Sequence, residues 1–337
     1  MRGDAAPAAA CPVKQETGPG CEQKGGGISI KEFIFAITIT SLVFVFVSSI
    51  PILGAFAALL APLPLLYYYS RFGRTGGILV FAVSLAVAAV VLTSAGIGFD
   101  VRYLFVLGCA GPILSEVLRK NYGIEKTVIL SASCILVTGL LLLIYYSMTR
   151  GMSPFRLIEL SILDMVRTTV NAYPDAGVTS EQIELIKKSA EQIAGVMTYL
   201  FPSIMIVGSV FVAWVNVMEG RLLFRFRKMW FPDFGDLTCW KIHDKFIWLV
   251  IASVVFVMLP VTGIRIVGFN MLVIQLFAYM LQGLAIVAFW LNRKKVPWFL
   301  RLFAYAFIFA QQFLLLIVIG LGMVDVWADF RKLNRAQ

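Results

Sequence analysis

The feature that most constrains this chain is a run of 37 residues, 33–69, that contains no charged side chain. A helix that crosses the hydrocarbon core of a bilayer needs about 20 apolar residues. Similar runs recur along the sequence, in which only 14% of the residues are charged, against about 25% in soluble domains. Only helices and closed barrels satisfy their backbone groups in lipid, and the alternating ten-residue segments of a barrel are missing. The sequence therefore predicts an all-α, polytopic transmembrane helical bundle.

The run 33–69 is too long for one crossing, and Ser48-Ser49-Ile50-Pro51 divides it. We expect about nine spans, five in a region 31–148 and four in a region 196–323. A polar tail, 1–30, comes first and is expected to be disordered, because it is rich in Gly and Ala. A short polar tail, 324–337, comes last. The predicted spans are 33–50, 52–69, 76–98, 101–118, 127–148, 196–218, 246–260, 264–291 and 298–323.

The positive charges set the expected orientation. Cytoplasmic segments of membrane proteins are enriched in Lys and Arg, and a cytoplasmic N-terminus places 19 of the 29 basic residues on that side. This distribution explains the net charge of +10 without nucleic acid. It predicts a multi-pass protein of a bacterial inner membrane, with the lipid bilayer as its main partner. Nine spans would leave "DFRKLNRAQ", with its three basic residues, on the extracytoplasmic side. The alternative is that this segment is an interfacial helix end. The side of the C-terminus therefore stays open.

Residues 149–195 interrupt the apolar pattern and are predicted to be an extracytoplasmic amphipathic helical insertion. Ser153-Pro154 indicates a first helix start, "NAYPDAG" a break, and Thr179 with Gln182 a capping box. In "VTSEQIELIKKSAEQ" the apolar residues share one helical face. We expect this second helix to rest that face on the bundle or the bilayer surface and to run through Gly195 into the next span. The more specific alternative is that this helix gates the access of a substrate to the bundle.

Two groups of residues within the spans are candidates for a ligand site. Pro62 and Pro64 remove two backbone donors and free the carbonyls of Ala58 and Leu60. Broken helices of this kind can build a site in the middle of a membrane, although a simple kink is the alternative.

The second group consists of amides. Gln275 and Gln282 share a helix face with Tyr279 between them, and Gln311 lies with Gln312 near the middle of the last predicted span. Amides in lipid need partners. They could bind a polar ligand or make interhelical hydrogen bonds, and the second use is the commoner one.

Charged residues near the ends of the spans are expected to form interfacial pairs. Glu116 stands three residues before Arg119, a spacing that favours pairing on a helix. Asn216 and Glu219 share a face, with Arg221 nearby. The cytoplasmic loop 231–246 contains aromatic residues and the only histidine, His243. It suggests interface anchoring or the docking of a protein partner.

The absence of motifs narrows the possible functions. The chain has no Walker A motif, H-E-x-x-H or G-x-S-x-G. Its five cysteines show no C-x-x-C spacing, which argues against a His/Cys metal site. We therefore expect neither an enzyme nor a cofactor or metal.

Four segments resemble the YybS-like family of uncharacterised bacterial integral membrane proteins. They are "SSIPILGAFAALLAPLPLLYYYSRFG" (48–73), "LFPSIMIVGSVFVAWVNVMEGRLLFR" (200–225), "LQGLAIVAFWL" (281–291) and "LGMVDVWADFRK" (321–332). The first spans are also distantly similar to the S components of energy-coupling-factor transporters, which capture vitamins or metals and dock on a separate energising module. The resemblance implies a solute-binding or transport-related protein without its own ATPase. The alternative is a non-catalytic scaffold that recruits envelope or division proteins, through an unknown membrane or cytoplasmic partner.

Overall fold

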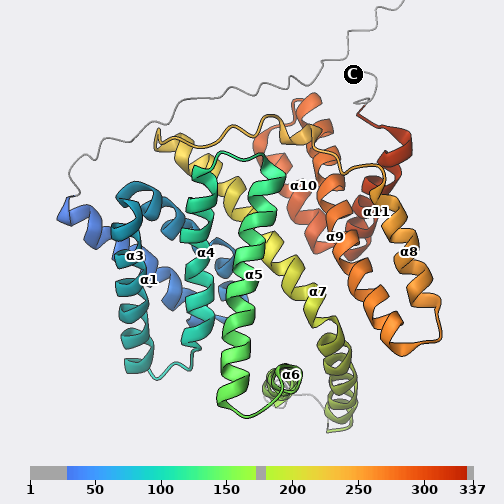
Figure 1. Cartoon of the computed structure of the whole chain (residues 1–337), viewed down its shortest axis with the longest axis horizontal. Helices are drawn as coiled ribbons and strands as arrows, with labels where there is room; N and C mark the ends of the chain where they lie inside the picture. The colour runs from blue at the N-terminus through green and yellow to red at the C-terminus, as the bar shows by residue number, and fades with distance from the viewer. Residues whose placement is uncertain (1–28, 172–179, 332–337) are drawn as a thin grey trace, which may run out of the picture. The chain divides into compact units, whose positions relative to one another are not determined.

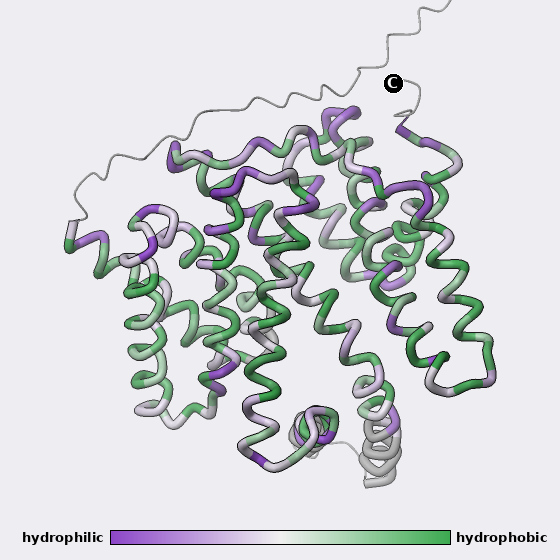
Figure 2. Tube along the Cα trace, viewed as in Figure 1, coloured by the Kyte–Doolittle hydropathy of each residue, from purple (hydrophilic) through white to green (hydrophobic). Residues whose placement is uncertain are grey.

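The computed structural model describes residues 29–171 and 180–331, and within these ranges the chain is helical and contains no strand. In most of the long helices, such as α5 and α9, hydrophobic residues fill most of the length (Figure 2). The all-α membrane bundle predicted from the sequence is therefore confirmed.

The helices follow one another in the order drawn in Figure 1. Their bounds are α1 Ile30–Ser49, α2 Pro51–Leu60, α3 Pro62–Ser94, α4 Val101–Arg119, α5 Ile124–Thr149, α6 Pro154–Asn171, α7 Ser180–Phe226, the 3₁₀ turn η2 Leu237–Cys239, α8 Phe246–Met258, α9 Thr262–Arg293, α10 Trp298–Ala310 and α11 Gln312–Ala328.

The described residues form two compact units. The N-terminal unit contains residues 29–201 and 208–233, and the C-terminal unit contains residues 202–207 and 234–331. Most of α7 therefore belongs with the helices that precede it.

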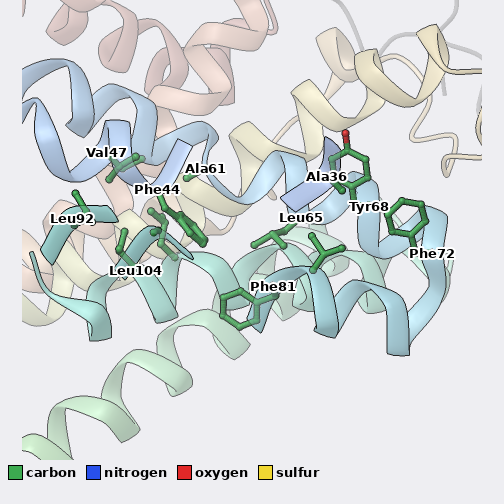
Figure 3. Close-up of a cluster of buried hydrophobic side chains, with 14 residues drawn as sticks. Ala36, Phe44, Val47, Ala61, Leu65, Tyr68, Phe72, Phe81, Leu92 and Leu104 are labelled. Carbon is green, nitrogen blue, oxygen red and sulfur yellow. The ribbon is translucent and has the colours of Figure 1, made fainter. Parts of the chain in front are cut away.

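The N-terminal unit begins with a helical hairpin at the predicted break. α1 ends at Ser49 and α2 begins at Pro51, where the missing N–H of proline costs no helical hydrogen bond. α3 packs against α1, and α4 packs against α3, and the apolar side chains of these helices meet in the core shown in Figure 3. Phe44, Leu65 and Leu104 are fully buried there.

The helix α3 changes direction at Gly73, whose backbone angles are φ 77° and ψ −175°. Only glycine adopts this conformation without strain. A Cβ added to Gly77 would lie 2.6 Å from the Cα of Tyr69, although residues eight apart in a straight helix are separated by about 12 Å. The two parts of α3 therefore fold back on each other, as the predicted separation of 52–69 from 76–98 requires.

Ion pairs mark one end of the N-terminal unit. Arg71 contacts Glu32 at 3.1 Å, which brings the start of α1 beside the Gly73 bend. Arg74 contacts Glu116 at 2.8 Å, which adds the end of α4. Three of the segments that the charge pattern assigns to the cytoplasm, those at Glu32, Arg71–Arg74 and Glu116, thus lie together.

The opposite end of α4 is held by cationic contacts. Asp100 caps α4 and pairs with Arg102 at 2.8 Å. The guanidinium of Arg102 lies 3.6 Å from the ring centroid of Tyr146, near the end of α5. The start of α4 and the end of α5 are therefore neighbours, so the two helices run in opposite directions, as two successive spans must.

The inserted segment after α5 contains α6 and the beginning of α7. As predicted, α6 starts at Pro154, and the Ser153 hydroxyl accepts a hydrogen bond from the Arg156 N–H at 3.3 Å. The predicted break and the capping box at Thr179 fall mostly outside the described residues.

The helix α7 runs without interruption from Ser180 through Gly195 to Phe226, which confirms the predicted continuity. Its 47 residues would measure about 70 Å, more than twice the hydrocarbon core of a bilayer. On the predicted docking face Ala194 is buried but Ile193 is 54% exposed. Ile183, Ile186 and the Glu184–Lys188 pair have side chains outside the described set.

Six of the described helical segments are long and apolar enough to cross a membrane, or seven if the bent pair α10 and α11 counts as one span. The predicted number of nine differs at two places. Residues 56–94 count as one segment although Gly73 divides them. The helix α8 is apolar but has only 13 residues, about 20 Å, because Pro260 follows its end.

Candidate functional site

A polar face on α9 lies in the interior of the C-terminal unit. Gln275, Tyr279 and Gln282 fall on one side of this helix, as their spacing predicts, and are exposed by only 4%, 0% and 0%. Burying three polar side chains without hydrogen-bond partners would cost folding free energy. The partners of each residue therefore decide what the face can do.

Gln275 makes hydrogen bonds through its amide nitrogen, whereas its amide oxygen is open, that is, without a hydrogen-bond partner. Its Nε2 donates to the Oγ of Ser253 at 3.0 Å and to the carbonyl of Leu249 at 3.3 Å, both on α8. The Ser253 hydroxyl in turn donates to the Leu249 carbonyl at 2.8 Å. The Oε1 atom of Gln275 is buried and has no hydrogen-bond partner.

Tyr279, one turn further along α9, has an open hydroxyl group. Its ring packs against Phe246 of α8, with ring centroids 5.8 Å apart. The hydroxyl oxygen is buried and has no hydrogen-bond partner. Since most buried polar atoms in proteins are paired, two open atoms on successive turns are an exception that needs a physical reason.

Gln282 is fully engaged within the protein. Its Oε1 accepts a hydrogen bond from the Ile242 N–H at 3.1 Å, and its Nε2 donates to Asp325 Oδ2 at 3.1 Å. The structure therefore gives Gln282 a packing role between α9, α11 and the loop before α8.

Asp325 and Arg331 form a fully buried ion pair that the sequence predictions missed. Arg331 Nη2 donates to Asp325 Oδ2 at 2.7 Å, and both side chains have 0% exposure. Arg331 Nη1 also donates to the carbonyls of Thr238 and Trp240, each at 2.8 Å. A single carboxylate in an apolar helix calls for a cation nearby, and this rule could have suggested the pair.

The Arg331 contacts also place the end of α11. They hold it beside the loop 238–240, which continues the basic segment after α7. Of the two locations left open for the C-terminal segment, these contacts favour the one beside the loop 238–240. The helix pair α10 and α11 is bent by 102° at its break, a geometry shared by broken spans and re-entrant loops.

Gln311 does not join the α9 face. It stands at the break between α10 and α11 with extended backbone angles, φ −107° and ψ 105°, and its side chain is exposed. The predicted continuous span 298–323 is therefore wrong at this position. Neither proline nor glycine stands at the break, so the usual sequence signals of a helix end were missing.

Close packing of α9 and α11 supports the polar face. A Cβ added to Gly283 would overlap the carbonyl of Val318, and one added to Gly322 would overlap the carbonyl of Tyr279. Small residues at such crossings let two helix backbones approach in a membrane. The backbone of α11 therefore lies directly against the turn of α9 that carries Tyr279.

Comparison with known proteins identifies the family. The family model described as "Predicted membrane protein (DUF2232)" matches residues 38–326. The chain belongs to the DUF2232 family. The uncharacterized protein YybS of Bacillus subtilis (strain 168) is 23% identical over 313 residues, which cover 90% of this chain and 97% of that protein. The predicted YybS-like membership is confirmed, whereas the similarity to energy-coupling-factor S components stays a prediction. No solved structure matches the chain.

In the N-terminal unit of this DUF2232 chain, α2 ends at Leu60 and α3 begins at Pro62, while Ala61 between them keeps helical backbone angles, φ −59° and ψ −32°. The carbonyl of Ala58, predicted to be free, accepts the Ala61 N–H at 3.3 Å. The carbonyl of Leu59 accepts a hydrogen bond from Asn216 Nδ2 at 2.7 Å. Asn216, which shares a predicted helix face with Glu219, is 0% exposed and thus binds the segment just before Pro62.

The other predicted interfacial pairs have mixed outcomes. Glu116 contacts Arg119 at 3.7 Å, as predicted, and also accepts hydrogen bonds from Arg74 and from the Tyr69 hydroxyl. Arg221 pairs with Asp233 at 3.5 Å. Within the described ranges, no group of three or more His, Cys, Asp or Glu side chains could hold a metal ion.

Proposed function

We propose that this multi-pass membrane protein binds a small uncharged polar solute at the α9 face and serves its transport without an ATPase of its own. The proposal rests on one observation, the two buried open atoms Gln275 Oε1 and Tyr279 Oη. Leaving a buried polar atom unpaired costs about 1–3 kcal/mol. A bound solute that donates to the amide oxygen and pairs with the phenol hydroxyl would remove this cost.

The chemistry of the two groups supports an uncharged ligand. An amide oxygen and a phenol carry no net charge, and the charged groups next to this face, Asp325 of α11 and Arg331 after it, neutralise each other. Gln275 lies 13 residues after the start of α9 and 18 before its end, so it is about 20–27 Å from either end. That depth suits solute sites, which lie near the membrane midplane in many transporters.

Localisation in a bacterial inner membrane with a cytoplasmic N-terminus is part of this proposal. It is supported by the excess of basic residues on one side and by the ion pairs that gather the expected cytoplasmic segments at one end of the N-terminal unit.

Identification of co-purified small molecules tests the proposal. The wild-type protein in mild detergent should retain a solute that mass spectrometry detects, and Gln275→Leu and Tyr279→Phe should each reduce its amount at least about tenfold, the factor for a loss of about 1.4 kcal/mol. Gln312→Leu is the matched control, because this amide of the same unit is exposed and should leave retention unchanged. Equal retention by all four proteins would contradict the α9 site.

A second candidate function, a scaffold that recruits envelope proteins, is favoured by the length of α7. The 47-residue helix exceeds the thickness of a bilayer, so one end must project. Protein partners that survive purification, together with the absence of any solute affected by Tyr279→Phe, would favour the scaffold.

A further inference from the structure

The break between α10 and α11 lies well inside the membrane. α10 follows the basic end of α9 at Arg293, and basic residues mark the membrane surface. Ile308, near the other end of α10, belongs to the same core cluster as Met280 and Leu284 of α9. These two residues stand 13 and 9 positions before Arg293, or about 20 and 14 Å along a helix. The break at Gln311 therefore falls within a hydrocarbon core of about 30 Å, in a broken span and in a re-entrant loop alike.

The backbone loses three helical hydrogen bonds at this break. The helical pattern stops where the Gln311 N–H donates to the Phe307 carbonyl at 3.0 Å, and it resumes where the Leu315 N–H donates to the Gln311 carbonyl at 3.1 Å. No helical turn spans Gln311, whose backbone is extended. The N–H groups of residues 312–314 and the carbonyls of residues 308–310 are thus without their helical partners, and they bond to nothing else in the described part of the chain.

Two exposed amides stand at the same place. The side chains of Gln311 and Gln312 are exposed and make no hydrogen bond within the described residues. An unpaired polar group is costly in hydrocarbon. Non-helical backbone at this depth is tolerated only where protein buries it or where it lines a water-filled cavity. The single chain leaves the break uncovered, so one of these two environments must surround it.

The side chains beside the break favour protein over water. Phenylalanines stand on both sides of it in the chain, and each exposes about half of its surface or more: Phe303, Phe307, Phe309 and Phe313. A water-filled cavity with such walls would wet large apolar surfaces, which is unfavourable. Helices in a membrane instead associate through packed side chains, with amides as polar contacts between them. A protein surface therefore covers the break.

A second copy of this chain complements the break. The break presents both N–H donors and carbonyl acceptors, and each amide side chain both donates and accepts. A twofold axis sets the same groups of the two copies against each other in opposite order, so that donors of one copy meet acceptors of the other. We propose that two copies associate in the membrane through this break, with Gln311 and Gln312 at the centre of the contact. The contact uses other residues than Gln275 and Tyr279 and does not rest on the solute proposed for α9.

Disulfide cross-linking in native membranes tests the contact. In a cysteine-free background, Phe313→Cys places a thiol two residues from Gln311, so mild oxidation should link two copies into a dimer on a non-reducing gel. Val324→Cys is the matched control, because this residue of α11 is also exposed but stands 11 positions further on, about 17 Å along the helix, and it should link little. Equal linkage at the two positions, or none at 313, would overturn the proposal. A link from position 313 to a different protein would overturn it as well.

Removal of the two amides tests their part in the association. Gln311→Leu with Gln312→Leu makes these side chains apolar without changing a buried residue. In liposomes, energy transfer between donor-labelled and acceptor-labelled wild-type copies should fall as lipid is added. The double variant should need a roughly tenfold higher protein-to-lipid ratio for the same transfer, because several interhelical hydrogen bonds are lost. Unchanged transfer in the double variant would contradict a contact centred on the amides.

Discussion

At the scale of single residues, a carboxylate buried among apolar helices is stable only when a cation and hydrogen-bond donors surround it, and Asp325 has both. Arg331 neutralises its charge, while the amide of Gln282 and the N–H of Phe330 fill the remaining positions. These groups join α9, α11 and the loop before α8 through one side chain.

Removing one charge of this pair should be costly. We expect Arg331→Met to lower the free energy of unfolding by about 3–5 kcal/mol, because Asp325 would be left buried without its cation. The double variant Asp325→Leu with Arg331→Met should recover most of that loss. Additive losses in this double-mutant cycle, measured by thermal or denaturant unfolding, would show that the two side chains do not depend on each other.

Asp100 gives the fold a dependence on pH. Partial burial by itself would raise the pKa of this carboxyl, but hydrogen bonds from the side chain and the N–H of Arg102 outweigh it and hold the pKa below its ordinary value of 3.8. A carboxyl with a lowered folded-state pKa stabilises the fold above the ordinary pKa, and that stability is lost as the pH falls through the folded-state value.

The wild-type protein should therefore unfold at a higher temperature than Asp100→Asn at pH 6, and the difference should shrink as the pH falls below 4. Because the Asp100 side chain is about half exposed, the difference should be small and weaker in high salt. A difference that stays constant from pH 6 to pH 3 would exclude this role.

The spacing of polar residues predicts which of them share a face, but not which of them find partners. Gln275, Tyr279 and Gln282 lie together as their periodicity requires. The oxygen and the nitrogen of the Gln282 amide nevertheless each have a partner, Ile242 and Asp325, and these contacts join residues 40 and 43 positions apart. Tertiary packing alone determines such contacts, so the sequence could not separate a packing amide from an open one.

At the scale of helices, breaks follow from local chemistry where proline or glycine is present. The ends at Ile50–Pro51 and Ala61–Pro62 and the bend at Gly73 all have such a signal. The break at Gln311 has none, and for this reason a straight last span was predicted. The short α8 differs from this case, because Pro260 follows its end.

The crossing of α9 and α11 allows a matched test of helix packing. Gly322→Ala should lower the free energy of unfolding by about 1–3 kcal/mol, because the added methyl group overlaps the Tyr279 carbonyl. Gly320→Ala, two residues away, meets nothing within 4 Å and should be neutral or slightly stabilising, since Ala favours a helix more than Gly does. Equal effects of the two substitutions would contradict the close crossing.

At the scale of the whole molecule, the sidedness of the segments is an expectation drawn from charge and from the Arg331 contacts. Single cysteines in a cysteine-free background can test it with a membrane-impermeant thiol reagent. Positions 227 and 328 should be protected in intact spheroplasts and position 161 should react. Reaction at 227 with protection at 161 would reverse the orientation. Reaction at both 161 and 328 would show instead that α10 and α11 cross the membrane once.

The binding role of the α9 face is tested most directly by the stability of Tyr279→Phe after removal of all bound solute. The Tyr279 hydroxyl makes no hydrogen bond within the protein, so its removal takes away a buried open polar group and no interaction. The solute-free variant should therefore unfold at the same temperature as the solute-free wild type or a higher one, with a gain of about 1–3 kcal/mol at most. A midpoint several degrees below that of the wild type would show that the hydroxyl supports the fold and would contradict the solute site.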